Sequence, residues 1–298
     1  PNQFGMDQFD LEDALSNQKE YMCSADLKEF VEKYHLNLSQ DGTFNPRDIF
    51  GSHDDSDHVY NTPRAWYMAR CLNPSTMNWD GPDADFTPLS DDIPWCMVPE
   101  KKVTIEDVKY VLSSHFQGTP YDPYASYGDK SMKGAYRAIG VNRTDFLGII
   151  QMRPDAGEDS RAIEWVAFAS NVFNTAAPFY IDVEKVPEYF SNTTGDASTD
   201  NFYWASRMIA AMADASYKSS IFHIERYQER VMSKGHQLIG KYDALLEKES
   251  DAAKRMSLRH QANQEIADMV KKEASDTLNK VLYELSNQMK NAYSRSDA

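Results

Sequence analysis

Residues 145–183 of the chain read DFLGIIQMRPDAGEDSRAIEWVAFASNVFNTAAPFYIDV and carry its clearest β-strand pattern. Three runs rich in β-branched and aromatic residues, 145–153, 162–170 and 177–183, are separated by the turn-forming clusters DAGEDSR and NVFNTA. Short runs bounded in this way are typical of sheet strands, because the turn residues end each extended segment. The pattern predicts three strands, of which the first two form a hairpin.

The pattern changes to a helical one from Phe202 to the end of the chain. Apolar residues recur there at spacings of three and four along two long stretches, which is the periodicity of an amphipathic helix. The first stretch carries Ile221, Ile224, Val231, Leu238, Tyr242 and Leu245, and the second carries Ile266, Met269, Val270, Leu278, Val281, Leu285 and Met289. We expect two long helices packed as an antiparallel pair, and helices and sheet together predict an α+β fold.

A shorter helix precedes the strands and runs into an unusual segment. Thr104 and Asp107 give the pattern of a capping box, and apolar residues follow at helical spacing. Residues 113–124, SSHFQGTPYDPY, then bring a Gly, two Pro, three aromatic residues, a His and an Asp close together. Composition alone favours an aromatic-rich turn packed on the core over a loop at a functional site.

The charge and cysteine content limit the possible partners. The chain has 298 residues and a formal net charge of −15 at pH 7, from 46 acidic and 31 basic residues. This balance argues against nucleic acid, because phosphate backbones are bound by basic residues. No apolar run approaches the ~20 residues of a membrane span, so we expect no membrane partner. Cys23, Cys71 and Cys96 indicate neither a disulfide framework nor a thiolate metal site and favour a reducing, cytoplasmic location.

Three further features could contribute to a site. Residues 53–58, HDDSDH, contain metal-ligand residue types without the His pairing of a zinc motif or the spacing of a calcium loop, so a solvated acidic turn is favoured. Arg64 begins an apolar helix and is either buried with an anionic partner or exposed on the surface. Cys71 could be a nucleophile beside Arg70, although a single helical Cys is more often a core residue.

Several blocks of the chain, taken together, resemble one family. They are PNQF at the start, IFGS followed by YNTPRAWYMAR, VTIEDVKYVLSSHFQGTPYDPY, IGVNRTDFLGIIQMRPD and IEWVAFASNVFNTAAPFY. In this order, over most of residues 1–200, they resemble the bacterial dipeptidase A family of N-terminal-nucleophile cysteine hydrolases. The secernins and the bile-salt and penicillin amidases are more distant relatives of that family.

The resemblance implies an αββα sandwich. Residues 1–200 would be the C-terminal part of that hydrolase domain with helical and loop insertions, and residues 201–298 a region of long antiparallel helices. In the family the catalytic Cys is the first residue of the mature enzyme, uses its own α-amino group as the base, and lies upstream of the PNQF block. The resemblance therefore implies that this chain lacks the nucleophile-bearing N-terminal segment, is inactive alone and binds that segment as a partner.

The same resemblance suggests roles for individual residues. Asn2 matches an amidase Asn that helps to form the oxyanion hole, and Arg64 matches an active-site Arg. The residues expected to bind substrate are His115, Gly118, Thr119, Tyr121 and Asp122. We expect the helix to stop at His115 so that the following loop folds over a cleft, with Tyr121 and Asp122 facing the termini of the substrate.

The expected activity is hydrolysis of dipeptides by acyl transfer through the absent Cys, without a metal or a cofactor, in a homo-oligomer. Two alternatives remain open from the sequence. A related amidase could cleave another small amide, although the GTPYDPY block favours the dipeptidase branch. A noncatalytic interaction module built on the long helices would expose an apolar stripe and have no cleft.

Overall fold

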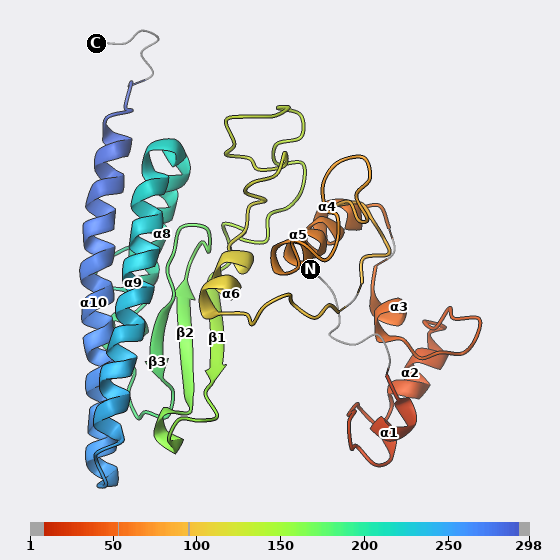
Figure 1. Ribbon diagram of the computed structural model, residues 1–298, viewed down its shortest axis with the longest axis horizontal. Helices are drawn as coiled ribbons and strands as arrows, with labels where there is room; N and C mark the ends of the chain where they lie inside the picture. The colour runs from red at the N-terminus through yellow and green to blue at the C-terminus, as the bar shows by residue number, and fades with distance from the viewer. Residues whose placement is uncertain (1–8, 53, 95, 292–298) are drawn as a thin grey trace. The chain divides into compact units, whose positions relative to one another are not determined.

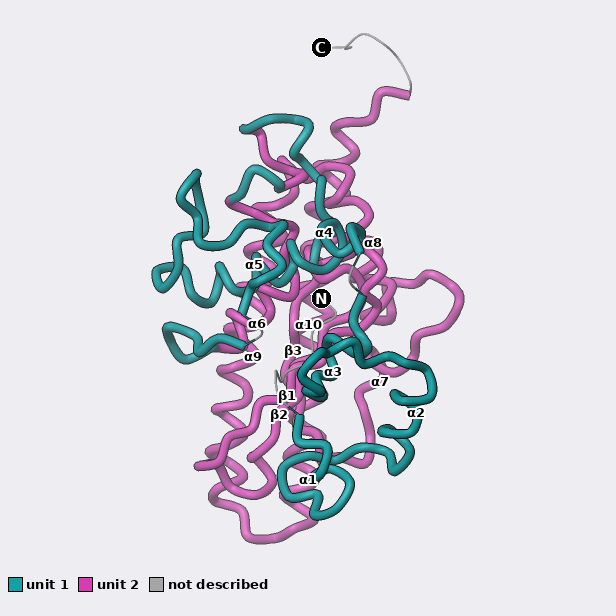
Figure 2. Tube along the Cα trace, turned by 90° about the vertical axis from the view of Figure 1, so that its right-hand side faces the viewer, with its two compact units in different colours: residues 1–103, 119–121, 128–139 teal, residues 104–118, 122–127, 140–298 magenta. Residues whose placement is uncertain are grey.

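The computed structural model describes residues 9–52, 54–94 and 96–291. The chain divides into two compact units, which Figure 2 distinguishes by colour. Unit 1 contains residues 1–103, 119–121 and 128–139, and unit 2 contains residues 104–118, 122–127 and 140–298. The helices after residue 201 thus belong to the same unit as the strands, and the division of the chain at residue 200 into a hydrolase domain and a helical region stays a prediction.

Unit 1 is built from short helices and long connections. Its helices are α1 (Leu11–Leu15), α2 (Leu27–Lys33), α3 (Pro46–Phe50), α4 (Asp57–Tyr60) and α5 (Thr62–Leu72). Pro63 lies in the first turn of α5, where its missing N–H leaves no helical hydrogen bond unmade. Trp66 and Tyr67 of α5 are buried, and the Trp66 Nε1–H donates to the carbonyl of Phe86 over 3.0 Å, which fastens the Pro-rich connection to the helix.

Unit 2 contains the predicted sheet. Strands β1 (Phe146–Met152), β2 (Ala162–Phe168) and β3 (Ala177–Tyr180) form a three-stranded sheet in the order β1-β2-β3, with both pairs antiparallel (Figure 1). The hairpin of the first two strands is confirmed, with Phe146 opposite Phe168 and Met152 opposite Ala162. The strands are shorter than predicted, because the connections between them begin earlier. Helices and an antiparallel sheet in one chain confirm the α+β class.

Five α-helices accompany the sheet among the described residues of unit 2. They are α6 (Ile105–Leu112), α7 (Glu188–Ser191), α8 (Phe202–Ala215), α9 (Tyr217–Leu246) and α10 (Ala252–Ser286). Figure 1 shows α9 and α10 side by side and running in opposite directions, as the periodicity predicts. Of the thirteen residues in the two predicted stripes, six are buried and five are partly buried, whereas Leu245 and Met289 are exposed and α10 ends before Met289. Among the described residues, most of the predicted stripe therefore packs against the core.

The long helices pack closely on β3. A Cβ at Gly235 of α9 would lie 2.7 Å from Cδ of Pro178, so the close approach requires a glycine. From α10, the Asn263 side chain accepts from the Tyr180 N–H over 2.9 Å and donates to the Tyr180 carbonyl over 3.0 Å. The amide of Asn263 thus makes the two hydrogen bonds that a neighbouring strand would make and satisfies the buried edge of β3.

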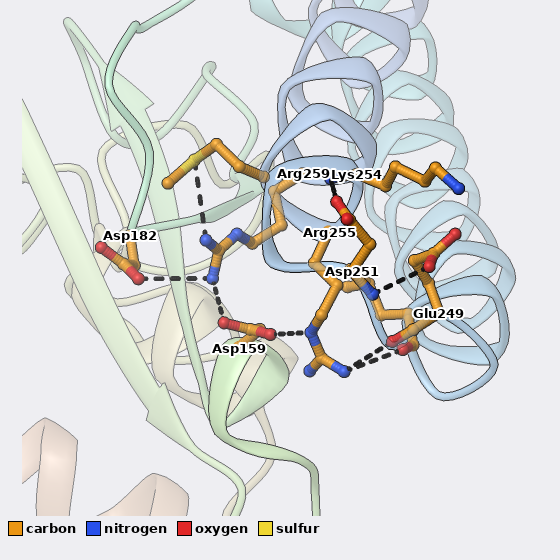
Figure 3. A network of polar contacts seen from close by, with 9 residues as sticks. Asp159, Asp182, Glu249, Asp251, Lys254, Arg255 and Arg259 are labelled. Atoms are coloured by element: carbon orange, nitrogen blue, oxygen red, sulfur yellow. Dashed lines mark hydrogen bonds and ion pairs between the residues drawn. The ribbon is translucent and has the colours of Figure 1, made fainter.

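An ionic network holds the β1–β2 connection against the start of α10 (Figure 3). Asp159, in the short 3₁₀ helix η1 (Glu158–Ser160), accepts from Arg255 and from Arg259, the latter over 2.6 Å. Arg255 also donates to the carbonyls of Leu246 and Glu249, which lie at the end of α9 and in the turn after it. One carboxylate with two guanidinium partners therefore joins the hairpin to both long helices.

One face of β1 is apolar and exposed. Phe146, Ile150 and Met152 alternate along the strand and keep 55%, 66% and 62% of their surface accessible. Residues two apart in a strand point to the same side of a sheet, so these side chains share one face.

In the part of the chain that the structure describes, no helix is both long enough and apolar enough to cross a membrane.

Candidate functional site

Arg64 lies in the first turn of α5, where its guanidinium binds the chain just before it. Its Nε–H donates to the carbonyl of Tyr60, and its Nη2 donates to Oδ1 of Asn61 over 2.9 Å. Burial, together with the nearby charge of Arg137, lowers the pKa of Arg64. The side chain is half-buried, and none of the described carboxylates forms an ion pair with it. Arg64 is thus neither a freely solvated Arg nor a paired one, and its catalytic role remains a prediction. Asn2 lies outside the described residues.

The predicted substrate loop begins earlier than expected, because α6 ends at Leu112 and not at His115. The Ser113 N–H reaches back to the carbonyls of Lys109 and Tyr110, which closes the last turn. The chain then adopts left-handed backbone geometry twice, at Phe116 with φ of 67° and at Gly118 with φ of 78°. Gly118 accepts this geometry without strain, whereas Phe116 is held in it by complete burial.

His115 and Asp122 face one another across this loop. The His115 Nδ1–H donates to Oδ1 of Asp122 over 2.9 Å, and the same oxygen accepts from the Tyr124 N–H over 2.9 Å. Their side chains are only 8% and 10% exposed. The carboxylate thus fixes the orientation and tautomer of the imidazole and leaves Nε2 as the ring nitrogen that accepts a hydrogen bond. A contact of Asp122 with a substrate terminus remains a prediction.

Two tyrosines complete the surroundings of His115. Tyr124 and Tyr217 stack with ring centroids 3.8 Å apart, and the edge of each meets the imidazole nearly at a right angle. The Tyr217 hydroxyl lies 3.3 Å from Nε2 of His115, and the Tyr124 hydroxyl donates to Asp214. Burial raises the pKa of both phenols, so both remain neutral hydrogen-bonding groups at physiological pH.

Thr119 and Tyr121 belong to unit 1, unlike the other three predicted substrate-binding residues. The Tyr121 N–H donates to Oγ1 of Thr119 over 3.2 Å, and the Tyr121 ring packs edge-on against Trp66 of α5. On its other side Tyr121 meets Tyr136 at a centroid distance of 4.7 Å. Burial, with Tyr121 beside it, raises the pKa of Tyr136 to about 12. Within unit 1, Tyr121 therefore lies against the helix that carries Arg64 and against the segment that carries Arg137.

A cavity of about 1290 Å³ in unit 2 is lined by His115, Gln117 and residues of α6 and α9. Lys109 of α6 borders it and was not predicted as a functional residue. Its ammonium donates to Oγ of Ser113 over 2.6 Å and to the carbonyl of Asn171 over 2.8 Å. Burial lowers its pKa from 10.5 to about 7. The sequence could have indicated this residue, because Lys109 follows the apolar Ile105 by four residues and so lies on the same, buried face of α6. A lysine is rarely fully buried unless it is paired.

The connection between β2 and β3 is another buried polar feature that the sequence did not indicate. Asn174 donates from Nδ2 to the carbonyls of Phe168 and Ala169, over 2.6 and 3.2 Å. Gln228 of α9 donates to the carbonyl of Asn174 over 2.9 Å. Side-chain amides thus replace the strand ladder in a buried turn. NVFNTA resembles an ordinary surface turn in sequence, and only the burial distinguishes it.

No group of side chains within residues 9–52, 54–94 and 96–291 has the arrangement needed to hold a metal ion. His53 of the HDDSDH segment lies outside these ranges. Cys71 is partly buried, and burial raises the pKa of its thiol, which is the opposite of what an activated nucleophile needs. The structure therefore supports core packing for Cys71.

Comparison with known proteins identifies the family. The sequence model of a protein family described as "Peptidase family C69" matches residues 1–230 of the chain. A "Dipeptidase" of Bifidobacterium longum (strain NCC 2705) is 48% identical, with all of this chain and 63% of the relative covered. A "Probable dipeptidase A" of Streptococcus pyogenes serotype M18 (strain MGAS8232) is 44% identical, with all of this chain and 60% of the relative covered. "Dipeptidase A" of Lactobacillus helveticus is 33% identical over 80% of this chain and 47% of its own length.

The chain spans about three fifths of the length of the first two of these relatives. The relatives' names agree with the resemblance to the dipeptidase A family that the sequence blocks indicate. A family model that covers residues 1–230 covers well over half of the 298 residues. The chain belongs to peptidase family C69.

Proposed function

We propose that the protein to which residues 1–298 belong is a dipeptidase. The observation that carries this proposal is the similarity over the whole chain, at 48% and 44% identity, to a Bifidobacterium and a Streptococcus protein that are both named as dipeptidases. Membership of a peptidase family supports hydrolysis of an amide bond as the reaction. The same similarity makes the dipeptidase branch a better proposal than an amidase for other small amides.

The proposed chemistry is acyl transfer to a cysteine that is not among residues 1–298. The thiol gives its proton to the α-amino group of the same residue, and the sulfur attacks the peptide carbonyl carbon. The C–N bond then breaks as the leaving amine takes the proton, and water hydrolyses the thioester. In this scheme Asn2 donates to the oxyanion, a contribution of roughly 10²–10³ in rate for one donor, and Arg64 stabilises nearby negative charge.

The loop of residues 113–124 is proposed to hold the substrate. Asp122 Oδ1 is engaged by His115 and Tyr124, whereas Oδ2 accepts no hydrogen bond from the described residues. This oxygen could take an α-ammonium group, which would distinguish a dipeptide from a longer or blocked peptide. His115, oriented by Asp122 and bordering the cavity, would shape the same end of the site.

The sandwich architecture and the partners are also proposals. Phe146, Ile150 and Met152 expose an apolar sheet face of the kind that folded proteins normally cover. We propose that another part of the same protein, including the segment with the nucleophile, covers this face and completes an αββα sandwich. A homo-oligomer is proposed as well, and three free cysteines support a reducing, cytoplasmic location.

The test uses the protein encoded by the complete natural gene. It should hydrolyse unblocked dipeptides and should cleave the matching tripeptide and the N-acetylated dipeptide at least about tenfold more slowly, since each lacks one correctly placed terminus. Iodoacetamide should abolish the activity, whereas EDTA should leave it unchanged. Efficient cleavage of other small amides with no dipeptide cleavage would favour the amidase alternative and overturn the proposal.

A further inference from the structure

Two guanidinium groups in unit 1 contact the same tyrosine, Tyr60. Arg64 donates from Nε to the carbonyl of Tyr60, and Arg137 places its guanidinium carbon 5.9 Å from the centroid of the Tyr60 ring. The Arg137 N–H also donates to the carbonyl of Val59 over 3.0 Å, which holds this part of the chain against α4. Backbone and ring contacts together therefore bring Arg137 into the neighbourhood of Arg64.

Neither arginine has an anionic partner among the described residues. Within the described ranges no Asp or Glu forms an ion pair with Arg64 or Arg137, although the chain carries 46 acidic against 31 basic residues. The Arg64 guanidinium uses Nε and Nη2, and the Arg137 guanidinium has no hydrogen-bond acceptor among the residues that the structure describes. Each group offers five N–H donors, so several donors on two adjacent cations remain available.

The proximity of the two positive charges on Arg64 and Arg137 is electrostatically unfavourable unless an anion binds beside them. Both residues are half-buried, and like charges in a partly desolvated place repel more strongly than in water. The lowered pKa of Arg64, caused by burial and by the charge of Arg137, has the direction expected for such a pair. Arg64 also lies in the first turn of the eleven-residue helix α5, where the helix dipole adds positive potential. All of these contributions favour an anion.

The surroundings suit the end of a small peptide better than a polyphosphate. Tyr121 lies between Trp66 of α5, the helix that carries Arg64, and Tyr136, the residue before Arg137. The Arg137 guanidinium itself lies over the Tyr60 ring. A net charge of −15 disfavours ligands with several negative charges. Two guanidinium groups can bind a single carboxylate through paired hydrogen bonds, and the nearby aromatic rings can contact an apolar side chain beside it.

We infer that Arg137, together with Arg64, binds the C-terminal carboxylate of the dipeptide. This inference rests on the proposed function and assigns Arg137 a role in substrate specificity. The enzyme would then require a free carboxylate, because a dipeptide amide leaves the two cations without a partner. Arg137 would contribute mainly to binding and little to the chemical step.

The first experiment measures binding without relying on turnover. The complete natural protein is exposed briefly to phenylglyoxal, and the modification rate of each arginine is followed by mass spectrometry, alone and with excess dipeptide or dipeptide amide. The dipeptide should slow modification of Arg64 and Arg137 at least about fivefold, and the amide should not. Arg143, an exposed arginine, serves as the internal control and should react equally in all samples. Equal protection by both ligands, or no protection, would overturn the inference.

The second experiment separates the inference from the proposed function. In the same protein, Arg137→Gln should raise the KM for an unblocked dipeptide by about 10- to 100-fold, the range for a lost hydrogen bond to a charged group, with kcat changed less than about threefold. Arg137→Lys should restore part of the loss, and Arg143→Gln should have no effect. An unchanged KM in a folded Arg137→Gln variant that still hydrolyses dipeptides would overturn the inference alone. Protection of both arginines in a protein without dipeptidase activity would instead overturn the proposed function.

Discussion

Replacement of Lys109 by Met should make the protein more stable at pH 6 and leave it about as stable as the wild type at pH 9. The folded protein holds the Lys109 amine at a pKa of about 7, against 10.5 for an unburied lysine, because burial penalises the ammonium form. Below pH 7 the amine is protonated in both states, and the folded state bears the whole cost of a buried charge. Between pH 7 and 10.5 only the unfolded chain holds the proton, so the stability of the wild type rises with pH.

The magnitude follows from the two pKa values. A change of one in pKa corresponds to about 1.36 kcal/mol, so the fall from 10.5 to about 7 is worth about 5 kcal/mol. Lys109→Met removes this cost but leaves the buried Asn171 carbonyl and the Ser113 hydroxyl without their donor, a loss of about 1–3 kcal/mol. The net gain should be about 2–4 kcal/mol at pH 6. By pH 9 the wild type regains about 3 kcal/mol, so the two proteins should then differ by no more than about 1 kcal/mol.

Urea unfolding followed by far-UV circular dichroism at pH 6, 7.5 and 9 measures this difference. All other titrating groups are common to both proteins and cancel. Lys102→Met, at an exposed lysine, is the matched control and should show no pH-dependent difference from the wild type. A Lys109→Met protein that is less stable than the wild type at pH 6, or whose difference stays constant with pH, would refute the buried, destabilised ammonium.

Three further changes test other parts of the structure. Gly235→Ala should lower the free energy of unfolding by about 1–3 kcal/mol, because its Cβ would lie 2.7 Å from Cδ of Pro178. Gly240→Ala in the same helix meets nothing within 4 Å and should raise the free energy of unfolding by up to about 1 kcal/mol. Thermal unfolding of the two variants measures both effects. Asp159→Ala should lower the unfolding free energy by about 2–4 kcal/mol, since it leaves the buried Arg259 with the exposed Asp182, 3.3 Å away, as its ion-pair partner. Asp155→Ala at an exposed site should change the unfolding free energy by less than about 0.5 kcal/mol. Asp122→Asn in the complete natural protein should raise the KM for unblocked dipeptides more than for N-acetylated ones, and steady-state kinetics showing equal effects would contradict its contact with the α-ammonium.

Sequence periodicity predicted the larger elements because their signals are local. The three strands follow from β-branched and aromatic runs between turn clusters, and α9 and α10 follow from apolar stripes. The break between α8 and α9 was not predicted, because the single residue Ser216 interrupts an otherwise continuous helical pattern. The helix end at Leu112 was also missed. It depends on the Ser113 hydrogen bonds and on the buried left-handed Phe116, which no propensity indicates.

Among the candidate site residues, the sequence indicates proximity only for those that are close in the chain. His115 and Asp122 belong to one loop, and their hydrogen bond forms within it. In contrast, Lys109 donates a hydrogen bond to the carbonyl of Asn171, and the Arg137 guanidinium lies over the ring of Tyr60. Both contacts join segments that are far apart in the chain. Such pairs depend on tertiary packing, so a single sequence gives their chemistry but not their proximity.

In the proposed reaction, a cysteine outside residues 1–298 performs the hydrolysis. We would therefore measure the initial rate of dipeptide hydrolysis by the complete natural protein carrying Cys23→Ala, Cys71→Ala and Cys96→Ala, before and after treatment with iodoacetamide. The rate should be close to that of the wild type before treatment, and no activity should remain after it. Loss of activity in the folded triple variant, or activity that survives alkylation, would show that the proposed nucleophile is wrong.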